Sequence, residues 1–287
     1  MRIIVAKDAG YCFGVREAVN LAYETARKHG EVYMLGHIVH NESVVSDLNK
    51  AGAKVVGALK EVPPDRPIIF RAHGTATDVW EKADELGMNI IDATCPLVRE
   101  IHQEVKTLAD EGRKIIIIGD HGHDEVVGIA SQVSDPLVVA TPDEARALRK
   151  MKEAGVVSQS TQTIENVQAI INILMTKVHD LRFVNTICFP TKRNQAQIKT
   201  LSEKCDVMII IGSFTSANSM RLAQLSKERN PRSYQVTCAD DIDVHWFEGA
   251  ELVGISAGAS TPDSIIREVT DKIKQINHIQ EEDMIHG

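Results

Sequence analysis

The chain has 287 residues, of which 43% are apolar and 25% are charged. This length exceeds one hydrophobic core and the composition is typical of folded globular proteins, so we expect two or three domains of about 100 residues. A net charge of −8 without a cluster of Lys and Arg argues against a nucleic-acid partner. No signal peptide and no apolar run of about 20 residues is recognisable, which predicts a cytoplasmic location and no membrane partner.

The first predicted elements are two strands joined by a helix. An apolar run in IIVAKDAG leads to Cys12, REAVNLAYETARKHG has a helical pattern, and the strand EVYML ends at Gly36. A further helix and strands lead to IIFRAHGT, a polar turn around His73. This order is typical of βαβ units, which require a parallel sheet.

The middle of the chain repeats this order. NIIDAT leads to Cys95, the helix LVREIHQEVKTLADEG follows, and KIIII ends at Gly119. The later polar turn of this copy, in GVVSQSTQ, surrounds Ser160. We expect one apolar face on the helix, formed by Leu97, Ile101, Val105 and Leu108.

The last part of the chain gives a third copy that lacks one strand. RFVNTI leads to Cys188, KRNQAQIKTLSEKC is the predicted helix, and DVMIII ends at Gly212. LVGISAGAST surrounds Ser260, and after the final helix, at about 262–276, the tail carries no recognisable element. We therefore expect residues 1–12 to supply the missing strand.

One spacing is kept to the residue in all three copies, because each glycine that closes a strand follows the cysteine by 24 positions. The predicted fold class is α/β, with three pseudo-threefold-related α/β domains. Their expected bounds are 13–95, 96–188 and 189–280, the last completed by the N-terminal strand 1–12, so each cysteine lies at a domain boundary. Ligands in open α/β sheets bind beyond the carboxyl ends of the strands, where these turns lie, although strand-end glycines are also compatible with architecture alone.

The three cysteines in register are candidate metal ligands. Each precedes a predicted helix, whose free N–H groups stabilise a thiolate, and a disulfide framework is not expected in a reducing compartment. A structural zinc site takes four ligands and often uses Cys-x-x-Cys spacing, which is absent; an iron–sulfur cubane normally takes four thiolates, so three would leave one iron open. Cys205 and Cys238 lie outside the pattern, and we expect both to be buried packing residues.

The glycine turns repeat a polar pattern as well. His40, His123 and Ser216 stand four residues after the glycine, and Glu42, Glu125 and Asn218 stand six residues after it. The other polar turns add His73, Ser160, Thr161 and Ser260. This mixture of imidazole, hydroxyl and amide groups suits an anionic ligand. Glu125 is the candidate proton donor, since a carboxyl in a cleft near a metal is readily tuned for that role; the alternative is an exposed acid at a helix start.

At these residues the sequence resembles the 4-hydroxy-3-methylbut-2-enyl diphosphate reductase family of the non-mevalonate isoprenoid pathway. The resemblance covers nearly the whole chain, from AGYCFGVREAV through AHG, DATCPLV, NTIC and NSMRL to SAGASTP. It implies a trefoil of three α/β domains around a central iron–sulfur cluster. It also implies an oxidoreductase that forms isopentenyl and dimethylallyl diphosphates by reductive dehydroxylation, with two electrons and two protons.

The resemblance assigns roles to the candidate residues. A [4Fe–4S] cluster would be held by Cys12, Cys95 and Cys188. The isoprenoid diphosphate would be bound by His40, His73, His123, Ser160, Ser216, Ala217, Asn218 and Ser260. Glu125, Ser160 and Thr161 would relay protons. Electrons are expected from a separate ferredoxin or flavodoxin, because no G-x-G-x-x-G fingerprint follows a strand.

The chain departs from the family pattern at three places. Positions 216–218 read Ser-Ala-Asn where the family often has two serines, so one hydroxyl contact is missing. Positions 123–125 read His-Asp-Glu where the family has His-Pro-Glu, and the loss of a proline removes a restraint on the backbone. Ser160 stands where threonine is usual and keeps the hydroxyl.

Two other classes of protein also explain the cysteines. One is a non-catalytic iron–sulfur or zinc protein, either a redox sensor or a scaffold, and the other is a plain electron carrier. Neither explains why His40, His123 and Ser216 share one register.

Overall fold

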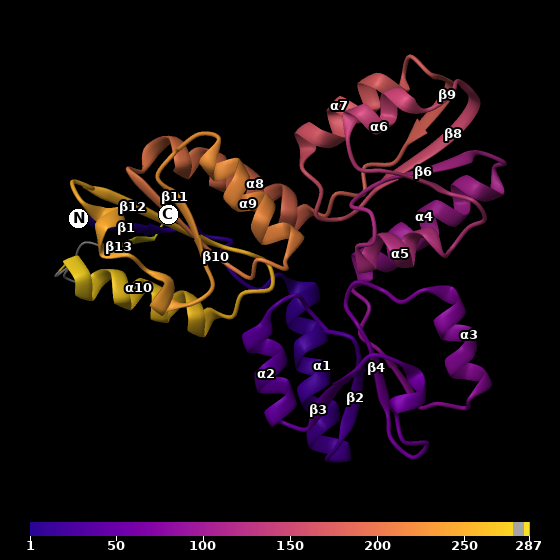
Figure 1. Ribbon diagram of the computed structural model, residues 1–287, viewed down its shortest axis with the longest axis horizontal. Helices are drawn as coiled ribbons and strands as arrows, with labels where there is room; N and C mark the ends of the chain where they lie inside the picture. Colours follow the sequence, from indigo (N-terminus) through magenta and orange to yellow (C-terminus); the bar gives the residue numbers. More distant parts are fainter. Residues whose placement is uncertain (278–283, 287) are drawn as a thin grey trace. The chain divides into compact units, whose positions relative to one another are not determined.

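The structure, a computed structural model, describes residues 1–277 and 284–286 (Figure 1). Over these residues the strands form three separate parallel sheets, which confirms the predicted α/β class. The chain groups into two compact units. Unit 1 contains residues 1–13, 40–44 and the described residues from 189 onward; unit 2 contains 14–39 and 45–188. One sheet belongs to unit 1 and two belong to unit 2.

The first sheet of unit 2 has the strand order β3-β2-β4-β5. Its strands are β2 (Val32–Leu35), β3 (Ala53–Val56), β4 (Ile68–Phe70) and β5 (Ile90–Asp92). This part of the sequence also forms α1 (Phe13–His29), α2 (Glu42–Lys50), the 3-10 turn η1 (Leu59–Glu61) and α3 (Thr77–Glu85). Phe70 meets the indole of Trp80 edge-on with ring centroids 4.7 Å apart, so aromatic packing holds α3 on the sheet.

The second sheet of unit 2 has the equivalent order β7-β6-β8-β9. Its strands are β6 (Lys114–Ile118), β7 (Leu137–Val139), β8 (Met151–Ser158) and β9 (Val178–Phe183). Its helices are α4 (Pro96–Asp110), α5 (Asp124–Ala130), α6 (Pro142–Ala147) and α7 (Ile164–Leu174).

Alternate residues of β6 pack against different helices. Ile115 and Ile117 share a core cluster with residues of α4 and α5, whereas Ile116 and Ile118 share one with α6 and α7. A strand covered on both faces explains the unbroken apolar run KIIII. The predicted apolar face of α4 is right at three positions, but Val98 is buried in place of Leu97, because a helix turn of 3.6 residues lets either one align with Ile101.

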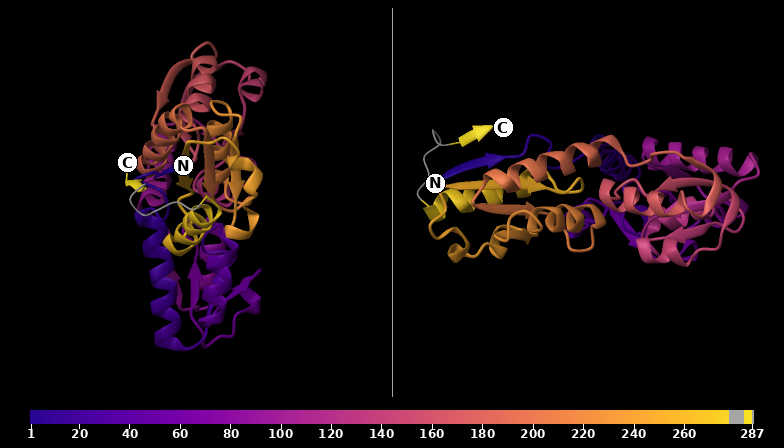
Figure 2. Two further views of the ribbon diagram at one scale, coloured as in Figure 1. Left: turned by 90° about the vertical axis from the view of Figure 1, so that its left-hand side faces the viewer. Right: turned by 90° about the horizontal axis from the view of Figure 1, so that it is seen from above.

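The sheet of unit 1 has the order β11-β10-β12-β1-β13. Its strands are β1 (Arg2–Val5), β10 (Val207–Ile211), β11 (Ser233–Val236), β12 (Leu252–Ala257) and β13 (Met284–His286). Its helical elements are α8 (Phe189–Lys204), α9 (Ala217–Lys227), the 3-10 turns η2 (Ala239–Asp241) and η3 (Val244–Phe247), and α10 (Asp263–Asn277). Helices α8 and α9 share a core cluster with one face of this sheet, and α10 shares one with the other (Figure 2).

The N-terminal strand joins this sheet. Arg2 to Val5 pair in parallel with Leu252 to Ile255, the position that β5 and β9 occupy beside β4 and β8 in the other two sheets. In the tail, where no element is recognisable from the sequence, β13 pairs in parallel with the outer side of β1. Three residues without a turn signal are too few to be recognised as a strand from sequence.

The repeat places the three cysteines equivalently. Cys12, Cys95 and Cys188 follow β1, β5 and β9, and each directly precedes a helix, namely α1, α4 or α8. The predicted position at helix starts is therefore confirmed.

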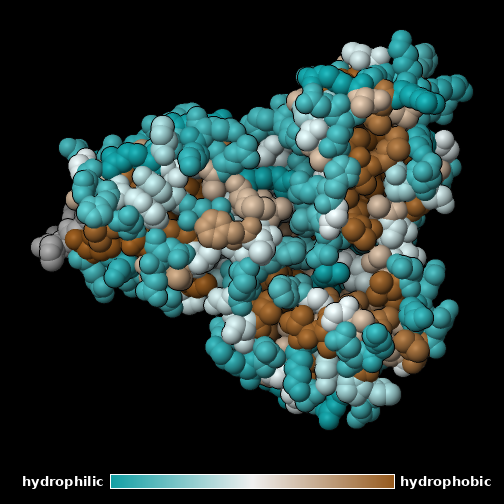
Figure 3. All heavy atoms as spheres, in the orientation of Figure 1, coloured by the Kyte–Doolittle hydropathy of each residue, from teal (hydrophilic) through white to brown (hydrophobic). Residues whose placement is uncertain are grey.

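Teal, hydrophilic residues cover most of the face in Figure 3, with brown, apolar residues between them. No helix among the described residues is long and apolar enough to span a membrane.

Candidate functional site

Each of the three cysteines makes an equivalent backbone hydrogen bond. The N–H of each donates to a carbonyl in a polar turn at the end of the neighbouring strand: Cys12 to Ala259 at 3.2 Å, Cys95 to Ala72 at 3.0 Å and Cys188 to Ser160 at 3.0 Å. None of the three thiols is in a disulfide, and all three residues are partly exposed. A thiol at a helix start and partly open to its surroundings is in a position that favours a thiolate.

The two units contribute the cysteines separately. Cys12 belongs to unit 1, whereas Cys95 and Cys188 belong to unit 2. Over the described residues neither unit by itself gathers three His, Cys, Asp or Glu side chains that could hold a metal ion.

Cys95 packs against a residue that has no side chain. A Cβ added to Gly14, near the start of α1, would lie 2.4 Å from the sulfur of Cys95. Such a distance is far shorter than a normal van der Waals contact. Any side chain at position 14 would therefore clash with the sulfur in its present position. The sequence pattern does not reveal this requirement, because the two residues are far apart in the chain.

Glu125 is buried in unit 2. It is the second residue of α5 and only 1% of its surface is exposed. Its Oε1 accepts from the backbone N–H of Ser160 at 2.6 Å, and its Oε2 accepts from the Ser160 hydroxyl at 2.9 Å. The alternative of an exposed acid at a helix start is therefore wrong.

Gln159 is a buried polar residue beside Ser160 that the sequence patterns did not single out. Its side chain is fully buried, its Oε1 accepts from the backbone N–H of Asp120 at 3.0 Å, and its Nε2 donates to the hydroxyl of Thr161 at 3.1 Å. Gln159 thus ties the turn that contains Ser160 and Thr161 to the turn before α5. Its place inside the polar segment SQSTQ was the available signal.

Two of the predicted histidines meet in unit 2. The rings of His73 and His123 lie edge to face with centroids 5.9 Å apart. His123 caps α5, since its Nδ1 accepts from the backbone N–H of Glu125 at 3.1 Å. Next to it, Asp124 pairs with Arg71 at 2.6 Å.

His102 lies beneath the turn that holds His73. A Cβ added to Gly74 would lie 2.9 Å from its ring, and its Nε2 is buried without a hydrogen-bond partner among the described residues. Burial, and secondarily the positive charge of Lys106, lower the pKa of His102 to about 4, while Asp92 acts in the opposite direction. His102 is therefore a neutral packing residue at physiological pH.

The remaining predicted ligand residues lie in unit 1. Ser216 caps α9 by accepting from the N–H of Ser219 at 3.3 Å, and the next two residues, Ala217 and Asn218, are buried in the first turn of that helix. The hydroxyl of Ser260 donates to the carbonyl of His40 at 3.1 Å. Unit 1 thus brings the turns of His40 and Ser260 together.

The position of the helix-capping residue in the first copy differs by one residue from that in the other two. His123 and Ser216 are the capping residues of their helices, but α2 is capped by Asn41, whose Oδ1 accepts from the N–H of Val44 at 3.1 Å. His40 therefore stands one residue before the cap. Glu42 is the first helical residue, whereas Glu125 and Asn218 are the second.

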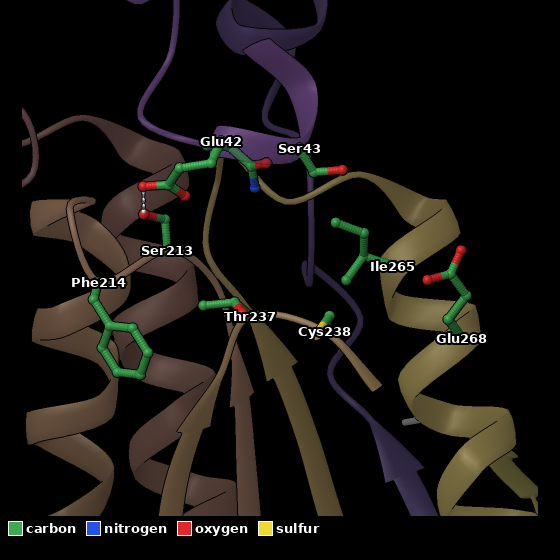
Figure 4. A pocket seen from close by; sticks show the side chains of 9 residues that line it. Glu42, Ser43, Ser213, Phe214, Thr237, Cys238, Ile265 and Glu268 are labelled. Atoms are coloured by element: carbon green, nitrogen blue, oxygen red, sulfur yellow. Dashed lines mark hydrogen bonds between the residues drawn. The ribbon is translucent and has the colours of Figure 1, made fainter. Parts of the chain in front are cut away.

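Glu42 lines a separate cavity of about 380 Å³ in unit 1 (Figure 4). Its Oε1 accepts from the hydroxyls of Ser213 at 2.8 Å and Thr215 at 2.9 Å.

Cys238 lines the same cavity, so its expected role as a buried packing residue is wrong. That role is confirmed for Cys205, which is 6% exposed and whose thiol has a pKa raised to about 11, mainly by burial.

The sequence and the fold both have known relatives. The family model described as LytB protein matches residues 3–274. The 4-hydroxy-3-methylbut-2-enyl diphosphate reductase of Geotalea uraniireducens is 42% identical over 280 residues, which cover 96% of this chain and 98% of that protein. The reductase of the same name from Geobacter sulfurreducens is 40% identical over 279 residues, with 97% and 99% covered.

Solved structures of such reductases match the fold. The E-1-hydroxy-2-methyl-but-2-enyl-4-diphosphate reductase of Plasmodium falciparum is similar with a TM-score of 0.94 and 27% identity, covering 100% of this chain and 92% of that one. A structure of (E)-4-hydroxy-3-methyl-but-2-enyl diphosphate reductase, described as the terminal enzyme of the non-mevalonate pathway, matches with a TM-score of 0.70 and 37% identity, covering 96% and 100%. Because the family model and both bacterial relatives match almost the full length, the chain belongs to the LytB protein family.

Proposed function

We propose that this protein is a 4-hydroxy-3-methylbut-2-enyl diphosphate reductase. In the reaction the allylic C–O bond breaks, the hydroxyl leaves as water, and the allyl group gains a hydrogen to give isopentenyl or dimethylallyl diphosphate. Two electrons and two protons balance this change. The relatives of nearly the same length are named as this reductase, which favours an enzyme over a redox sensor, a scaffold or an electron carrier.

One geometric relationship carries the proposal. Ser160 donates two hydrogen bonds to the buried carboxyl of Glu125, and its carbonyl accepts from the N–H of Cys188. A proton-transfer group is thus linked through a single residue to a candidate metal ligand. We assign Glu125 as the acid that protonates the departing oxygen, with the hydroxyls of Ser160 and Thr161 relaying protons.

The anionic end of the substrate is assigned to residues of the polar turns and helix starts. Helix starts favour phosphate because their N–H groups are free and the helix dipole is positive there. His123, Ser216 and their neighbours occupy such starts. The proposed diphosphate ligands are His40, His73, His123, Ser160, Ser216, Asn218 and Ser260, with Ala217 in contact but without a hydroxyl to offer.

The cysteines fit an iron–sulfur cofactor. Cys12, Cys95 and Cys188 would hold a [4Fe–4S] cluster, and the glycine at position 14 leaves room for the sulfur of Cys95. When bound, the cluster would supply electrons and an iron with an open position as a Lewis acid for the substrate hydroxyl.

Three further features belong to the proposal. The domains are 13–95, 96–188 and 189–280 with strand 1–12, of which residues 278–280 lie outside the described part of the chain. The electron donor is a separate ferredoxin or flavodoxin. The location is the cytoplasm. Support comes from the three sheets of equivalent strand order and from the lack of a dinucleotide fingerprint in the sequence.

The test is a turnover assay with anaerobically purified protein, a chemical reductant and 4-hydroxy-3-methylbut-2-enyl diphosphate. We expect both isopentenyl and dimethylallyl diphosphate as products, in proportion to the iron and sulfide content of the sample. Protein that contains iron and sulfide but forms neither product would refute the proposed function.

A further inference from the structure

Arg71 and Asp124 form an ion pair that joins two turns of unit 2. Arg71 directly follows β4 and Asp124 is the first residue of α5, and their side chains are 2.6 Å apart. Exposure is only 24% for the arginine side chain and 32% for the aspartate. A pair that is largely shielded from solvent is held more firmly than an exposed one.

Each partner is built into a turn that carries candidate site residues. The carbonyl of Arg71 accepts from the N–H of Gly74 at 3.2 Å, which closes the turn around His73. Asp124 stands between His123 and Glu125 at the start of α5. The ion pair therefore connects the turn of His73 to the turn of the other two residues.

The guanidinium of Arg71 also lies beside Gly36. A Cβ added to Gly36 would lie 2.9 Å from Nη1, and Gly36 has a φ of +72°, a conformation that favours glycine. Arg71 Nε is buried and has no hydrogen-bond partner among the described residues. Asp124 is thus the charged partner that restrains this guanidinium.

The backbone at His123 and Asp124 is compatible with a different restraint. His123 has φ −67° and ψ 135°, the conformation that a following proline requires, and the first position of a helix tolerates proline well. Proline at 124 would fix the backbone of this turn without any partner. Aspartate instead favours the helix start electrostatically and reaches across to the other turn.

We propose that the Arg71–Asp124 ion pair is a positioning device, which sets His73 relative to His123 and Glu125 in place of a proline restraint. Neither residue is assigned a contact with substrate. The same two repeats are also joined by Thr77, whose N–H and hydroxyl donate to Ser131 at 3.0 Å each. Loss of the ion pair should therefore loosen the turns without separating the repeats.

The inference rests on the proposed function, and its test begins with the wild-type enzyme. Wild-type turnover decides the proposed function; the ion pair is then tested by Asp124→Asn, Arg71→Gln, the double variant and Asp124→Pro. Each single polar variant should raise KM roughly three- to tenfold, which lies in the lower part of the range for coupled contacting residues, with a smaller change in kcat. The double variant should be no worse than either single one, and Asp124→Pro should recover most of the loss.

A second readout does not depend on activity. The imidazole NMR signals of His73 and His123 should shift in Asp124→Asn and return towards wild type in Asp124→Pro. Asp180→Asn is the matched control, because it breaks the Arg113–Asp180 pair of 3.1 Å, which lies outside these turns in the same unit. It should change neither KM nor the two histidine signals.

The inference is overturned if Asp124→Asn leaves KM and both histidine signals unchanged, or if it does no more than Asp180→Asn. It is also overturned if the effects of Asp124→Asn and Arg71→Gln add, since residues that act through one contact must be non-additive. Equal losses in Asp124→Pro and Asp124→Asn would refute the equivalence with proline.

Discussion

Ser160 donates two hydrogen bonds to Glu125, one from its backbone N–H to Oε1 at 2.6 Å and one from its hydroxyl to Oε2 at 2.9 Å. Both oxygens of a carboxyl that is 1% exposed are thus held by one residue. A buried carboxyl needs such partners, because an unpaired one is strongly unfavourable. The pair is therefore both a structural unit and the proposed route for protons.

Glu125→Gln tests the route directly. The amide is almost the same size and can still accept from the N–H of Ser160, so folding, iron content and diphosphate binding should remain close to wild type. It cannot deliver a proton, and kcat should fall by about 10²-fold or more. Anaerobic steady-state kinetics provide the measurement, and near-normal turnover would remove Glu125 from the proton route.

Substitutions of Ser160 separate the hydroxyl from the backbone contact. Ser160→Ala removes the hydroxyl that donates to Glu125 Oε2, which should lower the free energy of unfolding by about 1–3 kcal/mol and also reduce kcat. Ser160→Thr keeps a hydroxyl and should stay close to wild type in both respects. If the alanine and threonine variants have the same kcat, the Ser160 hydroxyl has no part in catalysis.

Gly14→Ala tests the fit of Cys95. The new methyl group would lie 2.4 Å from the sulfur, so the thiol must move and the iron and sulfide content of anaerobically purified protein should fall together with activity. Gly57→Ala is the control, because its Cβ would have a nearest neighbour at 3.5 Å and no positive φ opposes the change. Full cluster content in Gly14→Ala would show that the position of this sulfur is not critical.

His102 predicts how stability responds to acid. Its pKa is about 4 in the folded protein and about 6.5 when unfolded, so below pH 6.5 the unfolded chain takes up a proton that the folded one does not. Stability contributed by the neutral ring is therefore lost as pH falls from about 6.5 to about 4. His102→Gln should flatten this part of the profile, by roughly 3 kcal/mol at pH 4. Parallel urea-unfolding profiles of the two proteins between these pH values would contradict the assignment.

Elements that depend on residues close together in the sequence agree with the predictions. The strands that adjoin the cysteine and glycine turns, the helix starts after the cysteines and the place of strand 1–12 beside β12 follow from apolar runs and turns of a few residues, whereas β13 does not. Glu125 was found by its register, but the physical reason differs from alternation along a strand. It is the second residue of α5, and the N–H and hydroxyl of Ser160 hold its carboxyl in a buried position.

Contacts between turns that are far apart in the chain could not be predicted from the sequence. The link from Glu42 to Ser213 spans 171 positions, and nothing local to Arg71 identifies Asp124 as its partner. The register also failed by one residue in the first copy, where Asn41 takes over the capping role. Side-chain partners of this kind depend on how the turns meet, which spacing does not specify.

Mössbauer spectroscopy of anaerobically purified, iron-57-labelled protein, with and without 4-hydroxy-3-methylbut-2-enyl diphosphate, tests the reductase assignment most directly. Three cysteine ligands should give one iron that differs from the other three, and substrate should change the signal of that iron alone. Four equivalent irons whose spectrum does not respond to substrate would contradict the assignment, as would a stoichiometric zinc site without sulfide.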